Sequence, residues 1–243
     1  MIELDQKYTL PRHIAVIMDG NGRWAKKRGA TRVFGHKSAI KSVREVTEEC
    51  ARLGVDYLTL YAFSTENWGR PKAEVDALME LLVSSLKNEL ETLLKNDVKL
   101  NAIGDINGLP PKSSRELRDT INETSGNKGM LLTLALNYSG RWDIMGAIKK
   151  FTNEVCDGKL NIDDLSEDSF RQYLSTGSIP DPELLIRTSG EIRISNFLLW
   201  QLAYTELYFT DVLWPDFRKE HLIEAIKSYQ KRERRFGKIS EQV

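Results

Sequence analysis

Short runs of apolar and β-branched residues alternate along this chain with longer stretches whose apolar positions recur every three or four residues. The short runs predict six strands, at residues 14–18, 55–61, 98–103, 131–136, 184–186 and 207–209. The longer stretches predict helices with an apolar face, over residues 40–53, 71–96 and 144–155. This alternation favours an α/β fold, with a mostly parallel sheet of about six strands covered by helices on both sides. Ligands of such a sheet bind where the carboxyl ends of the strands meet the following loops.

The predicted helix over residues 71–96 has a broader apolar surface than packing against one sheet face requires. Its main stripe is formed by Val75, Leu78, Met79, Leu82, Leu86, Leu90 and Leu93. Leu81, Val83 and Leu94 widen that stripe. The pattern is compatible with a core helix covered on two sides and with the wall of a hydrophobic tunnel.

The composition is typical of a soluble globular protein. Of the 243 residues, 41% are hydrophobic and 29% charged, and there is no internal repeat or Pro/Gly/Ser-rich linker, so we expect one domain over residues 1–243. Lys plus Arg and Asp plus Glu both number 35. A chain without net charge has no overall field to attract nucleic acid, so any binding of anions must be local.

The cysteines and the apolar runs indicate a cytoplasmic protein. Cys50 and Cys156 lie in helix-like sequence without metal-ligand spacing, so we expect two reduced thiols. The first twelve residues carry charges where a signal peptide needs an apolar stretch, and no uncharged apolar run is long enough to span a bilayer.

The first predicted strand leads directly into the loop Asp19-Gly20-Asn21-Gly22-Arg23-Trp24-Ala25. Two glycines at the start of a helix suit a phosphate, because the backbone amides point outward there. Gly20 and Gly22 also fit a dinucleotide-binding fingerprint, but the acidic residue that should follow the second strand is missing, since Glu66 lies too far along the chain. The carboxylate of Asp19 would repel a diphosphate unless Mg²⁺ bridged them. The alternative for Asp19 is a helix N-cap.

Positive charge gathers around this loop. Residues 12–37 contain seven basic side chains and Asp19 as the only acid: Arg12, Arg23, Lys26, Lys27, Arg28, Arg32 and Lys37. Arg23 and Arg32 are the better candidates for phosphate, because a guanidinium binds phosphate oxygens in pairs, whereas residues 26–28 are equally compatible with a solvated helix face. His36 is a candidate donor to the same anion, or else a structural residue.

A second basic cluster follows the fifth predicted strand, at Arg187, Arg193 and Ser195. Two guanidiniums and a hydroxyl suit a second phosphate group, and two anion sites suggest two phosphorylated substrates. The alternative is a structural ion pair of Arg187 with Glu191 or Glu206.

Five segments carry a family resemblance, at residues 13–25, 34–36, 62–68, 185–191 and 193–201. Their motifs, in this order, resemble those of cis-prenyltransferases, the family of bacterial undecaprenyl diphosphate synthase. The resemblance covers nearly the whole chain. The chain departs from the family at residues 106–109, where many relatives have Ser-Arg-Phe, and at Ile192, which replaces a more polar residue.

The resemblance implies successive condensation of isopentenyl diphosphate onto an allylic primer, farnesyl diphosphate. The expected product is a long-chain cis-polyprenyl diphosphate, undecaprenyl diphosphate, the precursor of a lipid carrier for cell-wall synthesis. A short-chain cis-prenyl diphosphate synthase, a noncatalytic partner subunit of the same fold and a dinucleotide-dependent oxidoreductase are the alternatives. The presence of Asp19, Asn21, Arg23 and Arg32 together argues against the noncatalytic subunit. The missing ribose-binding acid and the carboxylate of Asp19 at the phosphate turn argue against the oxidoreductase.

The resemblance also implies roles for individual residues. Asp19 and Glu206 would hold Mg²⁺, which stabilises the departing diphosphate. The allylic diphosphate would be bound by Gly20, Asn21, Gly22, Arg23, Arg32 and His36. The reacting region would be lined by Trp24, Ser64, Thr65, Glu66, Trp68 and Arg70. Isopentenyl diphosphate would be held by Arg187, Arg193, Ile194 and Ser195.

Asn67 occupies the position to which proton removal is often assigned in the family. An amide lacks useful basicity, so we expect Asn67 to position a diphosphate oxygen or a water that accepts the proton. The segment Arg235-Phe236-Gly237 resembles a C-terminal motif that reaches the partner's site in a homodimer, or else forms a solvated basic helix end. Any membrane contact would be peripheral and serve product release.

Overall fold

A computed structural model of the protein describes residues 9–234 and shows a six-stranded sheet. All strand pairs are parallel, in the order β3-β4-β2-β1-β5-β6. The strands are β1 (His13–Ile17), β2 (Tyr57–Ser64), β3 (Lys99–Ile103), β4 (Leu131–Tyr138), β5 (Leu184–Arg187) and β6 (Glu206–Phe209). The predicted fold class, a single α/β domain with a parallel sheet of about six strands, is confirmed. That this domain extends over residues 1–243 stays a prediction at both ends.

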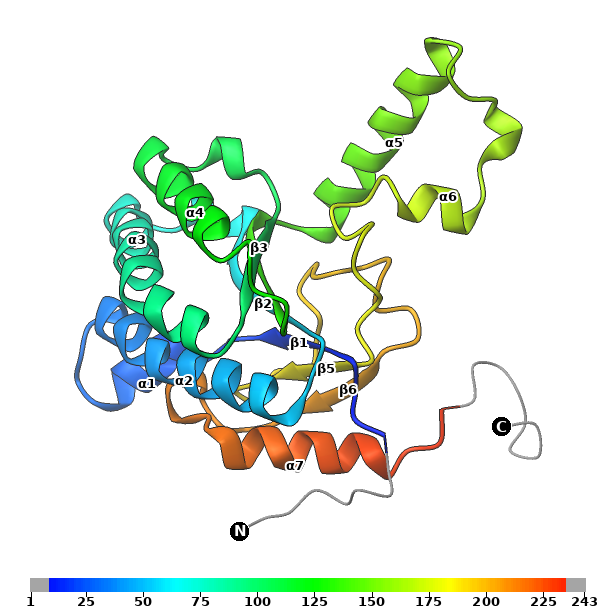
Figure 1. The fold of residues 1–243 in the computed structure, drawn as a ribbon. Coiled ribbons are helices and arrows are strands. Elements are labelled where there is room, and N and C mark those ends of the chain that lie inside the picture. Colours follow the sequence, from blue (N-terminus) through cyan, green and yellow to red (C-terminus); the bar gives the residue numbers. More distant parts are fainter. Residues whose placement is uncertain (1–8, 235–243) are drawn as a thin grey trace.

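Residues 9–234 contain seven α-helices, six between the strands and α7 after the last strand (Figure 1). They are α1 (Asn21–Lys27), α2 (Arg32–Leu53), α3 (Lys72–Lys95), α4 (Pro111–Glu123), α5 (Gly140–Cys156), α6 (Glu167–Arg171) and α7 (Lys219–Gln230). Short 3-10 turns lie at Thr65–Gly69, Ile106–Gly108, Ile162–Asp164 and Trp214–Asp216. Within residues 9–234, no helix is long and apolar enough to cross a membrane. Cys50 and Cys156 are free thiols, as expected.

The register of the central strands places the candidate loops at one edge of the sheet. Ile17, the last residue of β1, pairs with Tyr61 on one side and with Arg187 on the other. The loops that follow β1, β2 and β5 therefore leave the sheet at the same edge, because all three strands run in the same direction. β1 is buried along its whole length, as its apolar sequence requires.

The two faces of the sheet are covered in different ways. Helices α2, α3, α4 and α7 pack on the face that carries Ile14, Val16 and Leu58. The opposite face packs against the turn-rich residues 194–205, where Phe197 stacks on Tyr61 with ring centroids 4.3 Å apart. Helices α5 and α6 stand away from the sheet (Figure 1). The second face thus has irregular chain as its main cover, where helices were expected.

β2 contains a bulge, and after it the side chains point to the sheet faces opposite to those that strict alternation predicts. The register with β4 shifts between Tyr61 and Phe63 and again between Phe63 and Ser64. Strict alternation would place Phe63 with Tyr61, on the face opposite Leu60. In the structure, Phe63 instead belongs to the same buried cluster as Leu60, and Ala62 is exposed. The extra residue thus directs Phe63 into the space beneath α3.

Candidate active site

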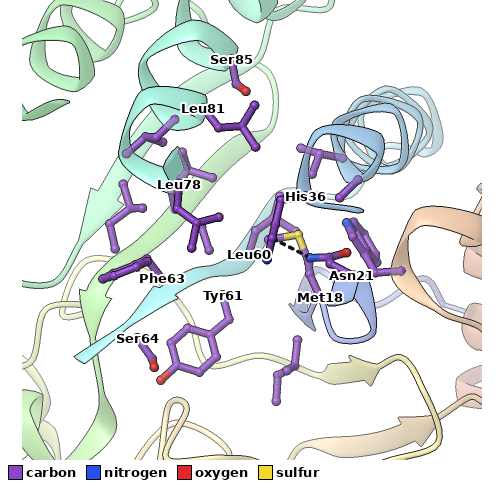
Figure 2. A pocket seen from close by; sticks show the side chains of 18 of the residues that line it. Met18, Asn21, His36, Leu60, Tyr61, Phe63, Ser64, Leu78, Leu81 and Ser85 are labelled. Atoms are coloured by element: carbon purple, nitrogen blue, oxygen red, sulfur yellow. Dashed lines mark hydrogen bonds between the residues drawn. The ribbon is translucent and has the colours of Figure 1, made fainter. Parts of the chain in front are cut away.

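A cavity of about 870 Å³ lies between α2, α3 and the sheet (Figure 2). Its mouth is polar and is lined by residues from the carboxyl edge of the sheet: Asp19, Asn21, His36, Ser64, Glu66, Asn67, Arg70, Arg141, Arg187, Ser195 and Asn196. Its interior is apolar and is lined by Ile40, Val43, Leu60, Phe63, Leu78, Leu81, Leu82 and Leu86, among others. The main apolar stripe predicted for residues 71–96, widened by Leu81, therefore forms a cavity wall, whereas Val83 is buried outside the cavity and Leu94 is exposed.

Backbone geometry fixes the position of Asp19 at the mouth. Gly20 has φ 107°, and a Cβ atom there would lie 2.9 Å from the Leu213 side chain, so glycine is required. The Thr188 hydroxyl accepts a hydrogen bond from the Asp19 amide at 2.9 Å and donates to the Asp19 carbonyl at 2.7 Å. Gly20, and not Asp19, is the N-cap of α1. The alternative interpretation of Asp19 as a helix cap is therefore not supported.

The carboxylate of Asp19 is surrounded by cations. Arg187 Nη2 donates to Asp19 Oδ2 at 2.9 Å, and Arg23 lies 3.3 Å from the same oxygen. Burial acts to raise the pKa of Asp19, but the hydrogen bond and charge of Arg187, together with Arg23, outweigh it and hold the pKa below its ordinary value. Asp19 is therefore an anion at neutral pH, and its side chain is about a third exposed (31%).

Arg187 also organises the loop that follows β5. Its Nη1 donates to the carbonyl of Arg193 at 2.5 Å and to Ser195 Oγ at 2.7 Å. Ser195 and Asn196 both have positive φ, an uncommon conformation for residues with side chains. The buried guanidinium thus holds a strained loop at the mouth, and the ion-pair partner of Arg187 is Asp19. Arg193 itself pairs with Glu191 at 2.5 Å.

A second group of cations gathers around one carboxylate at the start of α3. Glu74 lies 3.3 Å from Arg32 and 3.2 Å from Arg70, and its side chain is 11% exposed. The guanidinium of Arg32 lies over Gly22, where a Cβ atom would come within 3.2 Å of it. The arrangement leaves two cations at the mouth balanced by one acid.

His36 and Asn21 present unused polar atoms to this group. Asn21 Nδ2 lies 3.3 Å from His36 Nδ1, and because an amide nitrogen only donates, the proton of neutral His36 lies on Nε2. Within the described part of the chain, His36 Nε2 and Asn21 Oδ1 are buried without a hydrogen-bond partner. Burial, and then the charges of Arg70 and Arg32, lower the pKa of His36 to about 4. Nε2 of the neutral imidazole, 4.0 Å from Glu74 Oε1, thus makes no hydrogen bond, and a bound anion would give it an acceptor.

The 3-10 turn after β2 completes the mouth. Asn67 Oδ1 accepts a hydrogen bond from the Ser64 amide at 3.1 Å, so the amide oxygen of Asn67 is already used in capping the turn. Glu66 accepts a bond from Asn196 at 2.8 Å, which links this turn to the strained loop. Trp68 donates to Asn137 Oδ1 at 2.8 Å. The turn therefore has fixed contacts on both sides.

Comparison with known proteins identifies the family. A family profile described as "Putative undecaprenyl diphosphate synthase" matches residues 17–237. The chain is 54% identical to an isoprenyl transferase of Geobacter sulfurreducens over 234 residues, which are 96% of this chain and 95% of that protein. It is 52% identical to an isoprenyl transferase of Bacillus subtilis over 233 residues, 96% and 90% of the two chains. The chain belongs to the prenyltransferase family.

Solved structures of other prenyltransferases have the same fold. The lavandulyl diphosphate synthase of Lavandula x intermedia, in complex with dimethylallyl diphosphate, superposes with a TM-score of 0.92 at 40% identity, covering 94% of this chain and 99% of that one. A probable undecaprenyl diphosphate synthase from Campylobacter jejuni gives a TM-score of 0.79 at 35% identity, covering 95% and 100%. The predicted family resemblance is confirmed, and the oxidoreductase alternative falls away.

The structure of this prenyltransferase brings together most of the predicted site residues, though not all of them line the cavity. Nine do: Asp19, Asn21, His36, Ser64, Glu66, Asn67, Arg70, Arg187 and Ser195. Others lie just outside the cavity wall: Gly20, Gly22, Arg23, Arg32, Thr65, Trp68 and Arg193. Trp24 is buried and donates to Asp216, and Ile194 packs on the second sheet face. Those two contribute support to the neighbouring loops.

Glu206 is separated from the rest of the site and requires a correction. It is the first residue of β6 and pairs with Leu184, whereas Asp19 lies beyond the opposite ends of the strands. Its carboxylate pairs with Arg232 at 2.8 Å. A metal ion held jointly by Asp19 and Glu206 of one chain is therefore not compatible with the register of the sheet. Arg235-Phe236-Gly237 lies outside the described residues.

Three residues at the mouth have roles that the sequence analysis did not assign. Glu74 pairs the two mouth cations, Thr188 holds the backbone of Asp19, and Arg141 lines the cavity. An acid in the first turn of a helix is an ordinary feature of helices, so the sequence offers no sign that Glu74 belongs to a site. Thr188 directly follows the predicted site residue Arg187 in the sequence. Of the three residues, it is the one whose position could have indicated a place in the site.

Proposed function

We propose that this prenyltransferase condenses isopentenyl diphosphate successively onto farnesyl diphosphate and makes undecaprenyl diphosphate. The observation that carries the proposal is the cavity that joins a cation-rich mouth to a long apolar interior. A diphosphate needs cations and hydrogen-bond donors, whereas a growing hydrocarbon chain needs an apolar space. The cavity offers both within one continuous volume.

The mouth provides two groups of donors for two diphosphates. Arg32, Arg70 and His36 lie around Glu74 on one side, and Arg187, Arg193 and Ser195 lie on the other. We assign the first group to the allylic diphosphate, because it borders the apolar interior along α2 and α3. The second group would then bind isopentenyl diphosphate. Phosphate oxygens would replace Glu74 and Glu191 as partners of the exposed guanidiniums.

The chemistry requires a C–O bond and a C–H bond to break and a C–C bond to form. The allylic C–O bond breaks and the diphosphate leaves, the alkene of isopentenyl diphosphate attacks the allylic carbon, and a proton is lost. The guanidiniums stabilise the charge that develops on the departing diphosphate. Asn67 is not the base, because an amide is too weakly basic to take the proton; its oxygen is held by the Ser64 amide. Its amide nitrogen can donate to a diphosphate oxygen, which would be the proton acceptor.

We propose Mg²⁺ as the cofactor and Asp19 as its protein ligand. No group of three or more His, Cys, Asp or Glu side chains in residues 9–234 forms a metal cage. A lone ionised carboxylate at a diphosphate site nevertheless fits magnesium, which binds through one or two carboxylates together with substrate phosphates and waters. When bound, the ion would neutralise diphosphate charge.

A homodimer is also part of the proposal. Three large apolar side chains, Trp142, Met145 and Ile148, are exposed at spacings of three along α5. Ile162 and Leu165 add exposed apolar surface nearby in the chain, before α6. These elements stand away from the sheet (Figure 1), and a second copy would cover them. Sedimentation equilibrium of the purified protein should give twice the mass of one chain.

One incubation tests the reaction and its product. The protein is given radiolabelled isopentenyl diphosphate, farnesyl diphosphate and Mg²⁺, and the dephosphorylated products are separated beside polyprenol standards. We expect a product that migrates with undecaprenol. A product only one or two units longer than the primer would favour a short-chain synthase, an alternative supported by the high similarity to lavandulyl diphosphate synthase. No incorporation of label would contradict the proposal.

A further inference from the structure

Polar side chains join the apolar lining of the cavity at its far end. Along α3, Leu78, Leu81 and Leu82 line the interior, and Figure 2 shows Ser85 at the end away from Tyr61 and Ser64. Beyond Ser85, the lining continues with Glu89 and Thr92, which recur on the same side of the helix. On this side of α3 the lining thus changes from leucine to serine, glutamate and threonine about three turns along the helix, while the buried Leu86 and Leu93 continue the apolar lining beside them.

An ion pair joins the two walls at this end. Arg44 of α2 donates to Glu89 of α3 through both Nε, at 2.7 Å, and Nη2, at 2.6 Å. Both side chains line the cavity, together with Thr47 of α2. The Glu89 side chain is 15% exposed and that of Arg44 48% exposed, so the pair lies between the cavity and the solvent. Glu89 is about four turns beyond Glu74, a rise of roughly 22 Å along α3.

We propose that the Arg44–Glu89 ion pair stops the growing hydrocarbon chain where that chain runs between α2 and α3, and so sets the length of the polyprenyl product. This inference rests on the proposed function. The hydrocarbon end moves away from the mouth as each unit is added, because the diphosphate stays with the mouth cations. The first charged groups that it meets between α2 and α3 are Arg44 and Glu89.

Desolvation makes this pair a barrier to an apolar chain. The guanidinium of Arg44 has N–H groups that still face water, and a hydrocarbon covering them would remove that water without offering an acceptor. The doubly hydrogen-bonded geometry also holds α2 and α3 at a fixed separation. Growth past the pair must therefore either bury an incompletely satisfied charge or pull the two helices apart.

The chain offers a matched control. Lys87 of α3 pairs with Glu116 of α4 at 3.2 Å, so it joins α3 to its other neighbour. Neither residue lines the cavity. An effect that arises merely from tethering α3 would appear at both pairs, whereas an effect on chain length belongs only to the pair that meets the product.

The test compares product lengths on a polyprenol ladder for four proteins. Arg44→Met/Glu89→Leu replaces the pair with apolar helix formers, and we expect its main product to be at least two isoprene units longer than that of the wild type. Arg44→Glu/Glu89→Arg retains a charged pair and should keep the wild-type length. Lys87→Met/Glu116→Leu should also keep the wild-type length. Circular dichroism melts establish that each variant is folded.

The outcomes separate this inference from the proposed function. A wild type that makes no polyprenyl product overturns the function itself. A wild type that elongates, with an apolar variant of unchanged or shorter product length, overturns the inference, as does a control pair that lengthens the product equally. If the apolar variant does not fold, the nearly isosteric Glu89→Gln takes its place, and an unchanged length in that variant counts against the pair.

Discussion

The mouth and the interior of the cavity use the same elements in opposite ways. At the mouth, the ends of β1 and β5 and the first turns of α2 and α3 present charges that are already paired: Asp19 with Arg187, and Glu74 with Arg32. In the interior, α2 and α3 present apolar side chains to an open volume. The mouth is thus rigid because its polar groups hold one another, whereas the interior is defined by the spacing of the helices.

This difference determines what a substitution should do in each region. A charge removed from the mouth leaves a partner unsatisfied and a diphosphate without a contact, so catalysis or substrate binding should fail. A side chain enlarged in the interior fills space that the product needs, so the product should change while the chemistry continues. Mutations can therefore test whether the two regions are functionally separate.

The largest expected effect is that of Asp19→Ala. The variant loses a carboxylate that is about a third exposed and is also the ion-pair partner of the buried Arg187, so we expect a folded protein of lower stability. In that protein, turnover should fall a hundredfold or more, roughly the cost of removing a group that stabilises transition-state charge. Label incorporation and thermal melting measure the two properties. Asp119→Ala, an exposed acid on α4, serves as the control. A folded Asp19→Ala protein with wild-type turnover would disprove the metal assignment.

A second expected effect concerns stability and arises at the buried start of β1, away from the mouth. His13 lies between the Pro180 carbonyl and the Thr59 hydroxyl, and burial lowers its pKa from 6.5 to about 4. Below about pH 6.5 the unfolded chain takes up a proton at this position that the folded protein does not. The free energy of unfolding should therefore fall as the pH drops from 6.5 to 4, by about 3 kcal/mol in full.

Urea unfolding at several pH values measures this dependence. His36, whose pKa is also about 4, contributes in the same direction, so the comparison is between the wild type and His13→Gln, which retains His36. The variant should show a shallower decline in the free energy of unfolding below pH 6.5. Parallel curves for the two proteins would show that His13 carries no part of the dependence.

The sequence predicted the mouth better than the interior, for physical reasons. Asp19, Arg187 and Ser195 could be inferred because glycine turns and clustered arginines at strand ends have a direct chemical meaning. The six parallel strands followed from hydrophobic periodicity. Glu206 was assigned to the metal through the resemblance alone, and only the register of β6 shows that it lies at the other end of the sheet.

The interior depends on features that leave no trace in a hydrophobic pattern. The bulge at Ala62 shifts Phe63 to the side of Leu60, although alternation assigns these residues to opposite faces. Residues 194–205 cover the second face of the sheet, and several of them, such as Leu198, have a left-handed backbone although they are not glycine. The residue types give no indication of this conformation. Tertiary contacts decide both features.

A smaller effect should divide the mouth into two subsites. Arg32→Ala should raise the KM for farnesyl diphosphate about tenfold and change that for isopentenyl diphosphate little, because it removes a charge-assisted contact to one ligand. Arg193→Ala should show the reverse preference. Both side chains are more than half exposed, so the loss of their ion pairs should cost little stability. Arg118→Ala on α4 is the control, and equal effects on both substrates would mean that the partition is wrong.

The smallest expected effect on the chemistry, and the sharpest test of the interior, is that of Ala62→Leu. Ala62 lines the cavity at the bulge of β2, next to Phe63 and close to the mouth at Ser64. Because Ala62 is exposed to the cavity, a leucine there would extend into open space and should not overpack the core. The early condensations should continue, whereas a longer chain would collide with the added isobutyl group. We therefore expect shorter prenyl diphosphates on the polyprenol ladder.

Ala73→Leu, the same change at an exposed position of α3 outside the cavity, should leave the ladder unchanged. If Ala62→Leu folds and its products have the same length as those of the wild type, the growing chain does not pass the bulge of β2 and must reach the interior along α3 by another route.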